Sequence, residues 1–217
     1  MYYNSSIQNG LRILMALGAI AAVYYALWQT EDFSLVLARE DGLVEYGTAL
    51  FLFVGSLALI GLGRRNTGYR KGLLFFYALL FFFAAGEEIS WGQRIFGIES
   101  SEFFNENNRQ NETNLHNLVV GELHLASSLF GWVLTTVVLL YLVVLPILYP
   151  LANWVRQFCD ILAAPVPPRH IAALAVIWSL FIAWIDLPRN WEVYEYAFSL
   201  FVCMIFFAPV NRATFRL

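Results

Sequence analysis

The feature that most constrains this chain is a series of six apolar segments, each near the length needed to cross a membrane. A membrane-spanning helix needs about 20 mostly apolar residues, and it must satisfy its own backbone because lipid offers no hydrogen bonds. The segments that meet or approach this length are 11–28, 43–62, 72–86, 130–149, 171–185 and 193–209. We therefore predict a single all-α integral membrane domain over residues 1–217, a polytopic helical bundle of about six spans.

Composition supports this class of protein. Hydrophobic residues make up 59% of the chain and charged residues 13%, whereas soluble domains carry about 25% charged residues. We therefore expect the lipid bilayer as the main partner. The net charge of −3 gives no indication of nucleic-acid binding, and we expect none; protein partners are left open. The two cysteines, Cys159 and Cys203, have neither metal-binding spacing nor a pattern that indicates disulfides.

The distribution of basic residues predicts how the chain threads the membrane. Lys and Arg gather on the cytoplasmic side of membrane proteins. Nine of the 13 basic residues fall on one side of the six predicted spans: Arg12, Arg64, Arg65, Arg70, Lys71, Arg156, Arg169, Arg212 and Arg216. The other side receives all of the acidic residues except Asp160, including Glu40, Asp41 and Asp186. We predict both termini in the cytoplasm, an inner-membrane location and an acidic extracytoplasmic face.

The segment between the third and fourth spans is expected to be a partly helical extracytoplasmic loop. The chain stays largely apolar from 118 to 152, and a straight helix of that length would exceed about 50 Å. We therefore expect a break near Gly121 or Gly131. The part before the break is expected to lie along the outer leaflet or dip back into it, which would carry His116 toward the acidic residues.

Two adjacent glutamates end the third span in the stretch AAGEEISWGQRIFG. Glu87 and Glu88 oppose the helix dipole and lie near hydrocarbon, where an unpaired carboxylate is costly. Residues that break such rules tend to mark functional sites. If the helix continues past Gly86, Arg94 lies on the face of Glu87 and neutralises it, which leaves Glu88 without that partner. We predict catalytic roles for Glu87, Glu88, His116 and Arg94.

Two further glutamates are expected at the same depth. Glu45 and Glu195 open the similar stretches EYGTALFLF and EYAFSLFVC. Each also stands at the start of a helix that enters from outside, where a carboxylate is favoured by the helix dipole, so a structural role is equally open. A divalent metal ion held by Glu88, His116, Glu45 and Glu195 is an alternative to acid–base chemistry. His116 and His124 are too far apart in sequence for a paired helical metal motif.

Two resemblances bear on the acidic segments. Glu87 and Glu88 followed by Arg94 resemble the E-E-x-x-x-R motif of the CPBP intramembrane proteases, with five intervening residues instead of three; that family's F-x-x-x-H motif is absent. The stretches EEISWGQR and NLHN together resemble an uncharacterised group of bacterial multi-pass membrane proteins. The second resemblance implies a multi-pass membrane fold from about Glu40 to Glu195 and supplies no mechanism.

Three functions fit these features. The first is a membrane-embedded enzyme with a shallow extracytoplasmic site that acts on a lipid or lipid-linked substrate. The second is an ion or small-solute transporter, since carboxylates within membranes often mark ion pathways. The third is a non-catalytic assembly or accessory protein whose acidic residues form ion pairs.

Overall fold

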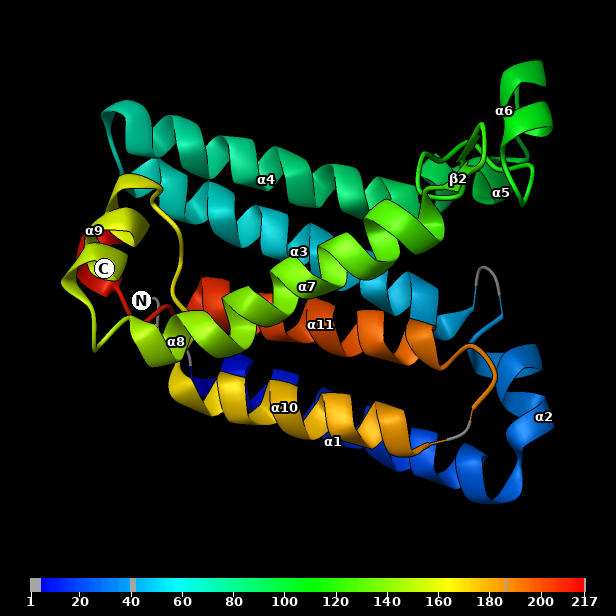
Figure 1. The fold of residues 1–217 in the computed structure, drawn as a ribbon, viewed down its shortest axis with the longest axis horizontal. Coiled ribbons are helices and arrows are strands. Elements are labelled where there is room, and N and C mark those ends of the chain that lie inside the picture. The colour runs from blue at the N-terminus through cyan, green and yellow to red at the C-terminus, as the bar shows by residue number, and fades with distance from the viewer. Residues whose placement is uncertain (1–4, 40–41, 186, 217) are drawn as a thin grey trace.

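A computed structural model of the chain describes residues 5–39, 42–185 and 187–216 as a bundle of long helices (Figure 1). Glu40, Asp41 and Asp186, which the sequence places on the acidic face, lie outside the described residues. The long helices run side by side along the longest axis of the molecule, and shorter elements gather at its two ends.

Each of the six predicted segments is helical. The long helices are α1 (Ser5–Trp28), α3 (Leu43–Arg65), α4 (Gly68–Glu88), a continuous helix over Ala126–Leu148, α10 (Arg169–Trp184) and α11 (Asn190–Phe207). Four of the described helices are long and apolar enough to cross a membrane: α1, α3, α4 and the helix over Ala126–Leu148. α10 is apolar but shorter. These helices fit a membrane protein, as the composition predicts.

The chain is apolar from about residue 118, but the helix over Ala126–Leu148 begins only at Ala126. It consists of the π-helical turn η3 (Ala126–Val133), α7 (Leu134–Leu139), the π-helical turn η4 (Leu140–Val144) and α8 (Leu145–Leu148). The strands β1 (Val119–Val120) and β2 (Leu123–His124) precede it as an antiparallel hairpin. The chain turns between them at Gly121, which has a φ of 62°. Of the two positions near which a break is expected, the chain turns at Gly121, whereas Gly131 lies inside η3.

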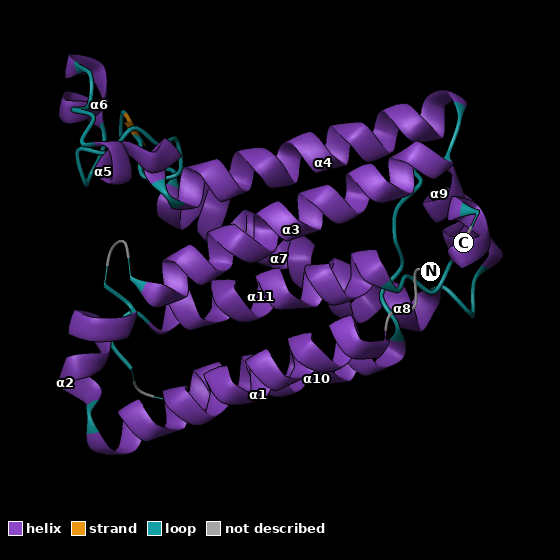
Figure 2. Ribbon diagram, turned by 180° about the vertical axis from the view of Figure 1, so that it is seen from behind, coloured by secondary structure: helices purple, strands orange, loops and turns teal. Residues whose placement is uncertain are grey.

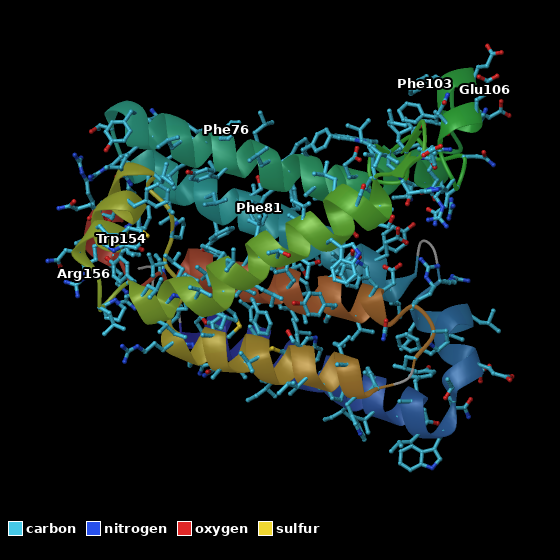
Figure 3. The ribbon with its side chains drawn as sticks, viewed as in Figure 1. Phe76, Phe81, Phe103, Glu106, Trp154 and Arg156 are labelled. Carbon is cyan, nitrogen blue, oxygen red and sulfur yellow. The ribbon has the colours of Figure 1, made fainter. Side chains whose placement is uncertain are left out.

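α11 lies at the centre of the bundle, with α3, α10 and α1 packed against it (Figure 1). Its residues from Leu200 to Phe206 are all buried. A helix that is apolar on all sides is stable only when other helices surround it. Phe81 of α4 points toward α11, where its ring meets that of Phe206 edge-on at 4.9 Å, whereas Phe76 points away from the bundle (Figure 3).

The two ends of the bundle differ in charge, and we call them the acidic end and the basic end. The acidic end carries Glu45, Glu88 and Glu195; it also carries the short elements α2 (Thr30–Asp32), η1 (Phe33–Leu37), η2 (Ser90–Gly92), α5 (Gln93–Phe96) and α6 (Glu102–Asn107). The basic end carries α9 (Asn153–Ile161), η5 (Arg212–Phe215) and both chain ends (Figure 2).

Side-chain hydrogen bonds fasten the basic end. Asn66, after α3, donates to the carbonyl of Phe215 at 3.5 Å. Thr214 donates to Asp160 of α9 at 2.6 Å, and Asn211 accepts from the Val166 amide at 2.9 Å. The last residues of the chain are therefore held against α9 and the α3–α4 connection.

Candidate carboxylate site

Glu88, the last residue of α4, lies within the electrostatic influence of carboxylates from two other helices. It interacts electrostatically with Glu195 and Glu192 of α11 and with Glu45 of α3. All four side chains are partly buried. The structure therefore brings together three of the predicted site residues, which lie far apart in the sequence.

The contact between α3 and α11 explains why Glu45 and Glu195 meet. The two helices begin at the same end of the bundle and pack against each other. The ring of Tyr196 lies over Gly47, where an added Cβ would stand 2.6 Å from a ring carbon. Phe51 then meets Tyr196 edge-on at 5.7 Å. The two similar E-Y stretches are thus neighbours. Glu45 lies in the first turn of α3, where the helix dipole favours its charge, whereas Glu195 lies beyond the first turn of α11, which contains Glu192 instead.

Glu192 is a member of the cluster that the sequence prediction omitted. It lies in the first turn of α11, and Arg189 donates a hydrogen bond to its Oε1 at 2.6 Å. The signal was present in the sequence, because residues three apart on a helix share a face and Glu192 stands three before Glu195.

Glu87 has a different role from its neighbour Glu88. Its side chain is only 5% exposed, and it accepts hydrogen bonds from the Trp91 indole at 2.8 Å, the Leu115 amide at 2.5 Å and the His116 amide at 3.2 Å. These donors use both carboxylate oxygens. Glu87 thus anchors the segment that follows α4, and its catalytic role stays a prediction.

The alternative in which Arg94 lies on the face of Glu87 required a helix that continues to Arg94, but α4 ends at Glu88. Ser90, Trp91 and Gly92 are all left-handed, with φ values of 46°, 55° and 75°, and this turns the chain sharply. The Trp91 ring folds back over Gly86, where an added Cβ would stand 2.8 Å from the indole.

Arg94 instead forms an ion pair with Glu112 within a buried polar network. Glu112 also accepts from Ser90 at 3.0 Å and from Asn114 at 2.7 Å. Asn108 donates to the Asn114 side chain at 2.9 Å. Asn114 is 1% exposed and Glu112 6%. We call residues 90–118 the asparagine cap; its buried amides bond to one another, so they are not presented to a sugar or phosphate.

His116 belongs to the asparagine cap and lies against Glu87. Its Nδ1 is 3.9 Å from Glu87 Oε2, and its side chain is 28% exposed. Burial lowers its pKa, against the opposing influence of Glu87, Glu112 and Glu192. The imidazole is therefore mainly neutral at pH 7. His124 is exposed on β2 and lies apart from this group.

The metal alternative finds no ligand set in the part of the chain that the structure describes. Those residues contain no group of three or more histidine, cysteine or acidic side chains that could hold a metal ion. The positions of the predicted ligands explain why they do not form a metal site. Both His116 contacts above are with Glu87, at the base of the asparagine cap, whereas Glu45, Glu88 and Glu195 meet between the helices.

The long apolar helices fit a helical membrane protein. Four glutamate side chains, one from α3, one from α4 and two from α11, gather at the acidic end of its bundle. Comparison of the chain with protein-family models, curated proteins and solved structures finds no match.

Proposed function

We propose that the chain crosses the inner membrane six times, with both termini in the cytoplasm and the acidic end outside. The gathering of basic residues at one end of the bundle supports this topology. Both native cysteines are buried, so single cysteines can be introduced at exposed Thr67 and Glu106. A membrane-impermeant maleimide should label Glu106→Cys in intact cells and Thr67→Cys only after lysis; labelling of both from the same side would refute the topology.

At the acidic end, we infer an acid–base site that acts on a lipid or lipid-linked substrate. One observation carries this proposal: Glu88 lies within the electrostatic influence of carboxylates from two other helices, while adjacent Glu87 is fully engaged by hydrogen bonds. Neighbouring carboxylates oppose one another's ionisation, and such a group can share protons between its members. A carboxylic acid beside a carboxylate can donate a proton and accept one.

The residues divide into distinct roles under this proposal. Glu88 and Glu195 exchange the proton with the substrate, and Glu45 and Glu192 supply the neighbouring charge. His116, neutral and within reach of the field of Glu192, offers a second proton acceptor. Arg94 supports the site indirectly, because its ion pair with Glu112 holds the asparagine cap in place.

The surface beside the cluster suits a membrane-embedded substrate. Leu43, which begins α3, is 71% exposed, Trp184 at the end of α10 is 67% exposed and Trp191 is 43% exposed. Tryptophan is typical of the boundary between lipid and water. A lipid lying along this surface would bring its polar group to the level of the four carboxylates.

Transport has less support from the interior of the bundle. Hydroxyl groups between the two ends bond to nearby carbonyls: Ser56 to Ala78 at 2.7 Å and Ser179 to Ala175 at 2.8 Å. Among the described residues, the cluster of acids is confined to one end. A route across the membrane would need further polar groups at mid-depth.

Substitution of Glu88, with Glu87 as the matched control, tests the acid–base proposal. Glu88→Gln removes a partly buried charge and should leave the thermal stability of the purified protein unchanged or higher, yet it should not restore the growth of a deletion strain. Glu87→Gln should weaken the asparagine cap. An apolar carbodiimide, which reacts with protonated carboxyl groups, should modify Glu88 or Glu195 but spare Glu87. A Glu88→Gln protein that fully complements the deletion would refute the proposal and favour an accessory role.

A further inference from the structure

The basic end contains an open cavity of about 280 Å³. This approaches the lower end of the range for small-molecule sites, about 300 Å³. Its described lining residues come from α1, the start of α10 and the segment that follows α11: Gln8, Arg12, Pro168, His170, Ala208, Pro209, Val210 and Arg212. Three separate parts of the chain therefore form its walls.

The side chains that line the cavity suit an anion. Arg12 and Arg212 contribute guanidinium groups and His170 an imidazole, and the described lining includes no acidic residue. Guanidinium groups bind phosphate oxygens through paired, charge-assisted hydrogen bonds. The sixteen-residue helix α10 also begins here, at Arg169, and a helix start favours negative charge.

The backbone around the cavity is held in a fixed position. Gln8 is 5% exposed, and its amide donates to the Met204 carbonyl of α11 at 2.9 Å. The Val210 amide donates to the Val166 carbonyl at 2.9 Å. Arg12 stands one turn after Gln8 on α1, so these two bonds fix the positions from which Arg12 and Arg212 reach the cavity.

The cavity lies where the surface changes from polar to apolar. Immediately after Arg12, α1 exposes Ile13 (60%) and Leu17 (55%), and after His170, α10 exposes Ile177 (61%). Acyl chains would lie along these residues while a phosphate group occupied the cavity. We propose that this cavity binds the phosphate group of an anionic phospholipid from the leaflet at the basic end. The apolar surface beside it favours a lipid over free phosphate.

Lipid titration tests this site independently of the carboxylate cluster. The full-length protein is placed in nanodiscs of phosphatidylcholine with a rising fraction of phosphatidylglycerol, and its thermal midpoint is measured. The midpoint should rise and saturate for the wild type. Arg12→Gln with Arg212→Gln should weaken the apparent affinity roughly tenfold or more for each guanidinium removed.

A matched control removes the same charge outside the cavity: Arg64→Gln with Lys71→Gln, both exposed at the basic end. This control should respond as the wild type does. Equal responses of all three proteins would overturn the proposal, and so would a loss of response in the control, which would indicate general surface charge. Inorganic phosphate is titrated in phosphatidylcholine alone; a response of the same size that depends on Arg12 and Arg212 would overturn the lipid assignment. Arg212→Gln alone serves if the double variant does not fold, and it should shift the same titration.

Discussion

Glu87 provides the sharpest test of how the asparagine cap is held on the bundle. Its carboxylate is 5% exposed and accepts from Trp91, Leu115 and His116. In Glu87→Gln one oxygen becomes an amide donor, so the donors on one side lose their acceptor. A hydrogen bond to a charged group contributes about 1.5–3 kcal/mol. We therefore expect Glu87→Gln to destabilise the cap by about 2 kcal/mol, and Glu87→Ala by more.

The loss should be local, because the apolar contacts that hold the bundle lie elsewhere, around α11. Hydrogen exchange of peptides covering 108–118 measures it. A change of about 3 kcal/mol for Glu87→Ala raises cap opening roughly 100-fold, whereas peptides from α11 should exchange as before. Glu106→Gln, at an exposed position on α6 that points away from the bundle (Figure 3), is the control. Unchanged exchange at Leu115 and His116 in Glu87→Ala would refute the assigned role.

Two further predictions concern the same region. Gly86→Ala places a Cβ 2.8 Å from the Trp91 ring. It should therefore displace the indole, weaken its hydrogen bond to Glu87 and lower the free energy of unfolding by about 1 kcal/mol. Thermal melting and tryptophan fluorescence check this, and an indole that stays in place would contradict it. The lowered pKa of His116 means that below about pH 6.5 the unfolded cap binds more protons than the folded cap, so cap stability should be complete well above pH 6.5 and fall as the pH drops through that value. Hydrogen exchange should show this fall, and His116→Gln should flatten it; a fall of equal size in the variant would assign it to other groups.

The helices were predictable because a single physical requirement dictates them. A long apolar segment in lipid must satisfy its backbone internally, so the segments 43–62 and 72–86 correspond to α3 and α4 with small shifts at their ends. The span over 130–149 begins four residues earlier, at Ala126. Its start could not be fixed from apolar residues alone, because the hairpin before it is also apolar.

The site was less predictable, because it depends on where the chain turns. The prediction that Arg94 neutralises Glu87 assumed a helix through Gly92, and three left-handed residues end that helix instead. Ser90 and Trp91 give no signal for this conformation; only Gly92 does. In the same way, the asparagine run reads as a solvated loop, and its burial rests on contacts with Glu112 that no local pattern shows.

Glu87 and Glu88 show how two adjacent residues of the same type can have different roles. Consecutive helical residues point about 100° apart, so Glu87 and Glu88 cannot face the same neighbours. Glu87 meets backbone N–H groups, which stabilise a charge and fix it in place. Glu88 instead lies within the electrostatic influence of Glu195, Glu192 and Glu45. The order along the chain matters as well: Glu87 comes first and fixes the cap, and the cap in turn holds His116 beside Glu87 itself.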